Sequence, residues 1–484
     1  MNVKALGIYL GRTQRVGVLF QYALPGADVI NRFVADDGFI ALAAAQPTLS
    51  ASLLAATPDE QALLWRDVAA REFNGAYSHK GKAWLLPAFF QNLLPEGVFR
   101  DHVAALRGCE PTDHFELLAA CGKDLPGNVF ALPVVLARDA LARYVTQNGD
   151  ALEMSVTADP LEEGVSLSGV QAKLGVIKDG ERYVARTRDR DTHIIAKLPV
   201  VGQPLLPELE YVSLRLASAA GVSVCQATLE PLEKLAVEHG YDLGDADART
   251  HFLAVVRYDR LPTGRVHCED FAQVLGVMPE NKYSGPRASY LAVAATLLAL
   301  PGAGEPAVHE LLRRILVNEM LGNPDMHLKN MGLWYPDGIH AALPPAYDIV
   351  ACASMSQRIG HALPILPDAL MPRVSAGAKL PKPSLTPGML RAFTAALGLA
   401  EKPATAALTE CVKKAGALWP EMIRASPLTA QQKSRLLAHF NAHPAVASLV
   451  RRQDRAAAQR PGQKNQAMKE ACKSVRKRYS QTKS

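Results

Sequence analysis

The sequence predicts an α+β fold, and three observations support that prediction. Near the N-terminus, KALGIYL from Lys4 and VGVLFQY from Val16 have the composition of β-strands and are joined by a polar turn. Further along, ELLRRILVNEML from Glu310 places apolar residues at helical spacing and leads toward the polar run NPDMHLKN. After that run, MGLWY from Met331 and AYDIV from Ala346 predict a hairpin of two short strands. A helix, a polar loop, a β-hairpin and an acid therefore follow one another.

The run NPDMHLKN contains the residue types that a phosphoryl-transfer site needs. Asp325 and Asn330 stand in the D-x4-N relation of the catalytic Asp and metal-binding Asn in the protein-kinase catalytic loop, and Asp348 follows where a second metal carboxylate is expected. Magnesium prefers hard oxygen ligands and usually takes one or two carboxylates, which Asn330 and Asp348 suit. An ordinary turn is the alternative, because Asn, Pro and Asp are frequent turn residues. The elements on either side favour the kinase interpretation.

A segment that starts at Gly164, GVSLSGVQAKLGVIKDG, is the candidate for a loop that covers phosphate groups. Small residues such as Ser168 and Gly169 let backbone N–H groups approach phosphate oxygens, and Lys173 adds positive charge. The segment has neither G-x-G-x-x-G nor G-x-x-x-x-G-K-[ST], so a plain β-hairpin with a KDG turn is the alternative.

A kinase also needs a strand lysine, a carboxylate that positions it, and a hinge. Lys197 in HIIAKLP is bracketed by apolar residues, which favours a covered strand over a solvated edge and requires an anionic partner. The predicted helix PELEYVSLRLASAAG offers Glu210 as that partner, although a first-turn Glu favoured by the helix dipole is an equal alternative. HFLAVVRYDR turns from apolar to polar as a hinge between lobes would, with backbone groups near Val256 and Tyr258 available to adenine.

Together these motifs resemble a known family. SLSGVQAK, HIIAKLP, ELEY, VVRYDR, HCEDFAQ, NPDMHLKN and PAYDIV are similar to the ordered motifs of HipA-type serine/threonine kinases, toxins of bacterial type II toxin–antitoxin systems. LPAFFQNLLPEG and FELLAACGKDLPGNVFALP are similar to the N-terminal subdomain of that family, and the resemblance spans roughly residues 3 to 440. It implies a two-lobed protein-kinase-like fold with a β-rich N-terminal subdomain, dependence on ATP and Mg²⁺, and phosphate transfer to a protein hydroxyl.

The resemblance also implies roles for individual residues. Asp325 corresponds to the catalytic base, Asn330 and Asp348 to the magnesium ligands, and Lys197 to the lysine on the α-phosphate, positioned by Glu210. The other implied ATP contacts are backbone groups of Val256 and Tyr258 at the hinge, Asp259 near the ribose, the loop residues Ser168, Gly169 and Lys173, and His327 and Lys329 near the γ-phosphate. Ser166 corresponds to the autophosphorylated serine whose modification ejects the phosphate loop, and Ser168 is the second candidate.

Two positions depart from the family pattern. Pro324 replaces the hydroxyl residue of N-[TS]-D-x-H-x-[KR]-N, which removes a backbone donor and fixes φ just before the base. Leu209 stands where an Asn commonly precedes the helix glutamate, which affects how Glu210 is supported. Neither change removes a catalytic group.

The motif positions divide the chain into four parts. Residues 1–140 form the predicted N-terminal subdomain, 141–258 the kinase N-lobe with its phosphate loop, 259–450 the C-terminal kinase lobe, and 451–484 a basic tail. The tail carries a net charge of +9 whereas the whole chain carries +6, and its polar composition predicts disorder. It is either a solvated tail or a segment that assists DNA contact beside a DNA-bound partner.

Composition predicts a globular cytoplasmic protein with no membrane contact. The chain has 484 residues, of which 49% are hydrophobic and 21% charged, enough for more than one core. Its longest apolar run, LAVAATLLAL, is too short to span a bilayer, and the N-terminus has no basic-plus-apolar signal. The seven cysteines include no C-x-x-C pair, which argues against a disulfide framework and a zinc site.

Three classes of function remain open from the sequence. The leading one is a toxic protein kinase restrained by a small DNA-binding, HipB-like antitoxin, which makes the main contact with DNA. The second is a corepressor that acts mainly by binding that antitoxin, and the third is a small-molecule kinase on the same scaffold. Intact Asp325, Asn330, Asp348 and Lys197 favour catalysis. The resemblance makes an aminoacyl-tRNA synthetase a candidate acceptor.

Overall fold

The computed structural model describes residues 2–23, 29–137, 141, 153–154, 157–161, 165–167, 171–187, 190–239, 241, 243, 250–355, 360–371 and 384–451. The predictions for Ser168, for Gly169 and for the basic tail after Arg451 lie outside the described residues. Within those residues, no helix combines the length and the apolar character that a membrane crossing requires.

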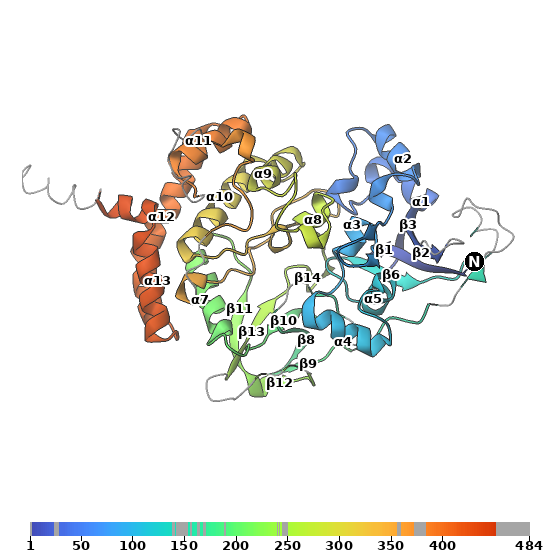
Figure 1. Ribbon diagram of the computed structural model, residues 1–484, viewed down its shortest axis with the longest axis horizontal. Helices are drawn as coiled ribbons and strands as arrows, with labels where there is room; N and C mark the ends of the chain where they lie inside the picture. The colour runs from blue at the N-terminus through green and yellow to red at the C-terminus, as the bar shows by residue number, and fades with distance from the viewer. Residues whose placement is uncertain are drawn as a thin grey trace, which may run out of the picture.

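An N-terminal domain is built on a mostly antiparallel sheet in the order β3-β2-β1-β6, with β7 pairing parallel to β1 (Figure 1). The two predicted N-terminal strands are β1 and β2, and alternation along β1 sends Leu6, Ile8 and Leu10 to one core and Val3 and Ala5 to another. The strands are β1 (Asn2–Leu10), β2 (Gln14–Ala23), β3 (Val29–Ala35), β4 (Tyr77–Ser78), β5 (Ala83–Trp84), β6 (Val129–Pro133) and β7 (Glu153–Met154). The helices are α1 (Asp37–Ile40), α2 (Pro58–Arg66), α3 (Ala88–Gln91), α4 (Gly97–Arg107) and α5 (His114–Cys121).

A second sheet, drawn in green in Figure 1, has the order β11-β13-β10-β8-β9-β12. It contains the β-hairpin with the KDG turn, the strand that carries Lys197 and the strand that leads into the hinge. Its strands are β8 (Lys173–Asp179), β9 (Arg182–Val184), β10 (Ile194–Lys197), β11 (Ala227–Pro231), β12 (Leu235–Ala236) and β13 (His251–Val256). Helix α7 (Leu206–Ala219) packs on one face, where its Leu209 and Leu216 share a core with Leu253 and Val255. The helix that the sequence predicted from Pro207 is therefore present, and its apolar side chains face this sheet.

The C-terminal lobe is mainly helical and surrounds the long helix α10 (Figure 1). Its helices are α8 (Phe271–Val274), α9 (Tyr290–Ala299), α10 (Gly304–Leu321), α11 (Pro387–Ala396), α12 (Glu401–Ala425) and α13 (Ala430–Ala442), and its strands are β14 (Arg260–Leu261), β15 (Gly264–Arg265), β16 (His267–Asp270) and β17 (Gly332–Tyr335). The α+β prediction is confirmed: a sheet-bearing lobe and a helical lobe follow a β-rich N-terminal domain.

The predicted hairpin of MGLWY and AYDIV is wrong. MGLWY does form β17, but its antiparallel partner is β16 rather than the downstream segment. Among the residues described, AYDIV makes one isolated bridge, from Ala346 to Val224, and Ala342, which lies before it, makes another to Trp334. Pro344 and Pro345 lie between these two bridges and have no N–H to donate, which prevents a continuous ladder.

A buried ion network joins the N-terminal domain to the segment after β13. Asp124 lies 2.9 Å from Arg260 and 3.2 Å from Arg257, and the Thr192 hydroxyl donates to it at 2.7 Å. Its side chain has no exposed surface, so the carboxylate depends on these partners for the stabilisation that water would provide. Burial alone would raise the pKa of Asp124, but the charges of Arg257, Arg260 and Arg265 outweigh it and lower the pKa.

Asp124→Asn should lower the free energy of unfolding by about 3 to 5 kcal/mol, because it leaves buried arginine charge without its carboxylate. Chemical denaturation of the variant and the unaltered protein measures the difference. Glu401→Gln is the matched control: its partner Arg391 is 70% exposed, so its loss should cost about 0 to 1 kcal/mol. Equal effects of the two substitutions would contradict the assigned role of the network.

A second buried acid, Glu319 near the end of α10, joins several C-terminal elements. Its carboxylate accepts from His361 at 2.8 Å, from His443 at 3.2 Å and from the backbone of Leu385 at 2.6 Å. Burial would raise the pKa of Glu319, but hydrogen bonds and charge from His361 and His443 outweigh it and lower the pKa from 4.5 to about 2. Because the folded pKa is depressed, the stabilisation is present above pH 4.5 and is lost as the pH falls toward 2.

Glu319→Gln should therefore flatten the dependence of unfolding free energy on pH between about 4.5 and 2. The slope should fall by up to about 1.4 kcal/mol per pH unit, which corresponds to one proton. Denaturation curves at several acidic pH values test this expectation. Glu305→Gln removes a more exposed Glu–His contact on the same helix and should leave the slope unchanged; an unchanged slope for Glu319→Gln would refute the linkage.

Candidate active site

Lys197 is held by two carboxylates on the covered face of the second sheet. Alternation along β10 buries Ile194 and Ala196 in one core and points Lys197 the opposite way, toward α7. Its ammonium group donates to Glu210 at 2.5 Å and to Asp348. Burial alone would lower the pKa of Lys197, but the charges of Asp348 and Glu210 outweigh it and raise the pKa, so the lysine is a cation at neutral pH.

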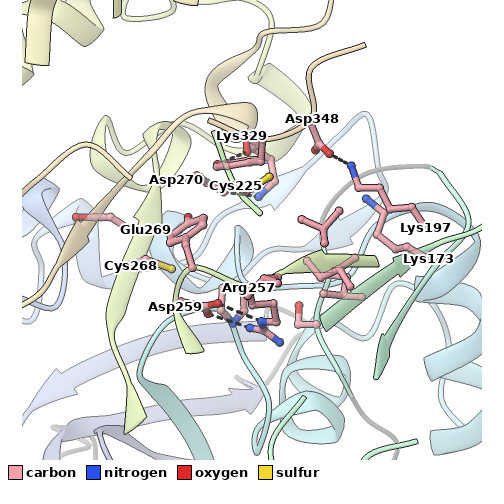
Figure 2. Close-up of a pocket in the computed structure, with 18 of the residues that line it drawn as sticks. Lys173, Lys197, Cys225, Arg257, Asp259, Cys268, Glu269, Asp270, Lys329 and Asp348 are labelled. Carbon is pink, nitrogen blue, oxygen red and sulfur yellow. Dashed lines mark hydrogen bonds and ion pairs between the residues drawn. The ribbon is translucent and has the colours of Figure 1, made fainter. Parts of the chain in front are cut away.

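Lys173 lies directly across from Lys197, in register on the neighbouring strand β8. Figure 2 shows the two lysines side by side, with Lys197 bonded to Asp348. Burial lowers the pKa of Lys173, while it would raise that of Asp348. The charges of Lys197 and Lys173 reverse the second effect and hold the pKa of Asp348 at about 2. Two cations and two acids are thus concentrated at one end of the sheet, an arrangement suited to a polyanion and a metal ion.

Asp348 has a left-handed backbone with φ of +53°, which is uncommon for a residue other than glycine. It follows Tyr347, whose ring stacks on Tyr258 from the hinge at a centroid distance of 5.8 Å. Strained backbone persists where the surroundings determine it. Here the stacked ring and the ion pair with Lys197 fix the residue on both sides.

The loop that contains Asp325 begins where α10 ends at Gly322, which has the left-handed conformation that terminates helices. The Asn323 side chain donates to Asn318 at 2.7 Å and accepts from the Asp325 amide at 3.2 Å. Asn330 then donates to the Asp325 carbonyl at 2.7 Å. The loop is thus closed by side-chain bonds on both sides of the exposed Asp325, and none of them uses the amide that Pro324 lacks.

Two cavities meet at this cluster. The inner one, of about 150 Å³, is lined by Ser166, Leu167, Ile195 and the hinge residues Val256 and Tyr258. The outer one, of about 610 Å³, contains Asp325, His327 and Asn330. Lys173 and Asp348 line both cavities. These two residues, which are predicted to bind phosphate and metal, therefore lie between the cavity at the hinge and the cavity that contains Asp325.

The donor set at the junction suits magnesium. Asn330 and Asp348 line the same outer cavity and offer an amide oxygen and a carboxylate, the hard oxygen ligands that this ion prefers. The side-chain amide nitrogen of Asn330 donates to the Asp325 carbonyl, which leaves the amide oxygen for a ligand. Among the described residues, no group of three or more His, Cys, Asp or Glu forms a separate metal cluster. The pair matches an ion that completes its shell with water and phosphate.

Lys329 is held differently from the predicted γ-phosphate contact. Its buried ammonium group donates to the Asn92 carbonyl at 2.8 Å, the Asn92 side chain at 3.2 Å and Asp270 at 2.7 Å. An ammonium group has three N–H bonds, and these partners use all of them. A phosphate contact would require one of these bonds to break. His327 lines the outer cavity, and its Nδ1 accepts from the Lys329 amide.

Two of the predicted nucleotide contacts at the hinge already have hydrogen-bond partners within the protein. Tyr258 lines the inner cavity, while the amide of Val256 already donates to the Gln226 carbonyl at 2.8 Å. Asp259 also lines the cavity, but its carboxylate accepts from Arg257 at 2.9 Å, Arg260 at 2.5 Å and the Gly127 amide at 2.8 Å. The ribose contact predicted for Asp259 would compete with these three donors, of which the Gly127 amide is distant in the sequence.

Ser166 lies against the N-terminal domain rather than toward the phosphate side. Its hydroxyl donates to the Leu93 carbonyl, and its amide donates to the Asp124 carbonyl at 3.1 Å. The flanking Val165 and Leu167 are buried in the core of that domain. Transfer of a phosphoryl group to Ser166 would therefore require this segment to leave its place.

Several residues of the site were missed by sequence reasoning. Asn92 and Asp270 hold Lys329, Glu96 pairs with Lys282 at 2.8 Å, and Tyr283 donates to Asp325 at 2.7 Å. Asn92, Glu96 and Asp270 lie within LPAFFQNLLPEG and HCEDFAQ, two motifs whose resemblance to the family implies no role for these residues. Asn92 is 237 positions away from its partner Lys329, so no spacing rule links the two residues. The sequence of Lys282 and Tyr283, NKYSGP, resembles an ordinary turn.

Comparison with known proteins agrees with this geometry. Residues 6–132 match the HipA N-terminal domain, and residues 165–419 match the HipA-like C-terminal domain, which covers more than half of the chain. The chain belongs to the HipA family. HipA from Shewanella oneidensis, solved in a complex of HipA, HipB and operator DNA, has a TM-score of 0.61 at 21% identity, over 92% of this chain and 99% of that one. The fold of this chain is thus the HipA fold.

Two curated relatives come from Sinorhizobium fredii and are both named as candidate kinases. Y4dM is 34% identical over 270 residues, which is 55% of this chain and 62% of the relative. Y4mE is 32% identical over 300 residues, which is 56% of this chain and 67% of the relative. The match thus spans less than two thirds of the length of Y4dM and about two thirds of the length of Y4mE.

Glu210→Gln should weaken Mg-ATP binding about tenfold, because Lys197 would then pair with Asp348 alone and lose its fixed position. Titration with a fluorescent ATP analogue and Mg²⁺ measures the affinity. Glu208→Gln, on the same helix and paired with His251 at 3.5 Å, is the matched control and should bind as the unaltered protein does. Equal affinity of the Glu210 variant would contradict the positioning role.

Proposed function

We propose that this HipA-family protein is an ATP- and Mg²⁺-dependent serine/threonine protein kinase that acts as a growth-inhibiting toxin. The observation that carries the proposal is that Glu210 and Asp348, the two acids that pair with Lys197, line one cavity together with Asp325 and Asn330. Phosphoryl transfer needs cations for the phosphates, oxygen ligands for magnesium and a carboxylate for the acceptor. A protein that only bound a partner would have no need to bury two lysines against these acids.

Each residue of the site has its own role in the proposed phosphoryl transfer. Lys197 and Lys173 neutralise phosphate charge, and magnesium, held by Asn330 and Asp348, would add further neutralisation. Asp325 orients the acceptor hydroxyl and takes its proton. The hydroxyl oxygen forms a bond to the γ-phosphorus while the bond from that phosphorus to the β,γ-bridging oxygen breaks, and ADP leaves.

Autophosphorylation of Ser166, or of Ser168 beyond the described residues, is part of the proposal. The position of Ser166 supports a regulatory role: its segment is buried in the N-terminal domain and borders the inner cavity. A phosphate carries close to two negative charges at neutral pH and cannot remain in an apolar core. Modification of Ser166 would therefore displace the segment and disrupt the nucleotide side of the site.

A small DNA-binding, HipB-like antitoxin is the proposed partner, and it would restrain the kinase and make the main contact with DNA. The support is the assembly in which the Shewanella oneidensis neighbour was solved, with HipB and operator DNA. An aminoacyl-tRNA synthetase is the proposed class of acceptor, and the basic tail would assist contact with DNA.

Asp325→Asn should abolish ATP-dependent autophosphorylation and growth inhibition, because an amide cannot take the acceptor proton. The substitution keeps the shape and an oxygen that can accept from Tyr283, so the fold should be intact. Labelled ATP and phosphopeptide mapping measure the first effect, with phosphate expected on Ser166 or Ser168. Growth after induction measures the second.

Asp59→Asn removes an exposed acid from α2 and should leave both properties unchanged. A fully toxic Asp325→Asn protein would refute the catalytic role. An unaltered protein that transfers phosphate only to a small molecule would support the small-molecule kinase alternative, and one that transfers none would support the corepressor alternative.

A further inference from the structure

Tyr283 contacts the Asp325 carboxylate from outside the catalytic loop. Its hydroxyl donates to Oδ1 of Asp325 at 2.7 Å. Its ring also meets the His327 ring edge to face at a centroid distance of 4.7 Å. The tyrosine thus touches two of the residues in NPDMHLKN through two different kinds of contact.

The segment that carries Tyr283 is fixed to the loop and to the N-terminal domain. The Leu328 amide donates to the Lys282 carbonyl at 3.3 Å, which ties the two backbones together. The Lys282 side chain reaches Glu96, at the start of α4, at 2.8 Å, and both side chains are largely buried. Glu96 also lies 3.9 Å from Lys329. A continuous set of contacts therefore runs from the N-terminal domain through Lys282 and Tyr283 to Asp325.

The base needs such support because of its position. Asp325 is exposed, and a carboxylate on an exposed loop turns freely unless a donor holds it. A bond to Oδ1 restricts this rotation and leaves Oδ2 for the acceptor proton. Proximity contributes strongly to catalysis, and a displacement of about 1 Å can cost about a hundredfold in rate.

We propose that Tyr283 is a positioning residue that holds Asp325 for proton transfer, and that Glu96 of the N-terminal domain sets the place of Tyr283 through Lys282. This inference rests on the proposed kinase activity and assigns the N-terminal domain a part in it. Tyr283 is 46% exposed and lines the outer cavity, so the same residue lies where an acceptor approaches.

Tyr283→Phe tests the proposal in the full-length protein. The substitution keeps the ring and removes only the hydroxyl. The rate of autophosphorylation at saturating Mg-ATP should fall about tenfold to a hundredfold, while the Mg-ATP concentration for half-maximal rate and the binding affinity stay unchanged. Tyr77→Phe is the matched control: that tyrosine is 41% exposed, lies in β4, and its ring contacts Trp84 and His79 rather than the catalytic loop. It should behave as the unaltered protein does.

A double-mutant cycle tests the connection to the N-terminal domain. Glu96→Gln should lower the saturating rate about threefold to tenfold, and it should add little once Tyr283→Phe is present, because both act on the same carboxylate. Unchanged rates for Tyr283→Phe, or a raised half-maximal Mg-ATP concentration, would overturn the positioning role. Fully multiplicative effects of the two substitutions would overturn the connection. Lack of transfer by the unaltered protein would instead overturn the proposed kinase activity itself.

Discussion

The need to neutralise a buried lysine organises the active site. Lys197 lies on a central strand with 5% of its side chain exposed, and a charge so placed must find acids or lose its proton. One acid comes from helix α7 and the other from the far lobe, so the ion pairs bring three separate parts of the chain to one point. The left-handed backbone at Asp348 and the packing of α7 are both arranged around this contact.

The N-terminal domain is joined to both sides of that centre. Asp124 binds the arginines after the hinge strand, Asn92 binds Lys329, and Ser50 donates to Glu269 on β16 at 2.6 Å. These contacts are buried and polar, and each supplies a further partner to a charged group of the kinase-like lobes. The domain is therefore structurally part of the site, as Figure 1 shows by its position against the two lobes.

Sequence reasoning succeeded where local patterns determine the structure. The apolar stripe of α7, the strand around Lys197 and the helix before Asp325 depend on periodicity and on stop signals such as Gly322, which are visible in one dimension. It failed at the downstream hairpin, where two prolines prevented pairing. It also could not foresee that Asn92 and Gly127 of the N-terminal domain would bind Lys329 and Asp259, because contacts over more than a hundred positions leave no local trace.

The attachment of the N-terminal domain limits how the two lobes move. Kinase-like lobes admit and release nucleotide by rotation about a hinge, yet here a third body is bonded to the hinge arginines and to the catalytic lobe at once. Because the N-terminal domain is bonded to both, it restricts rotation of one lobe against the other about the hinge. Residues 165–167 pack into the core of the N-terminal domain, and Ser166 and Leu167 also line the inner cavity, so these three residues connect that domain directly to the cavity.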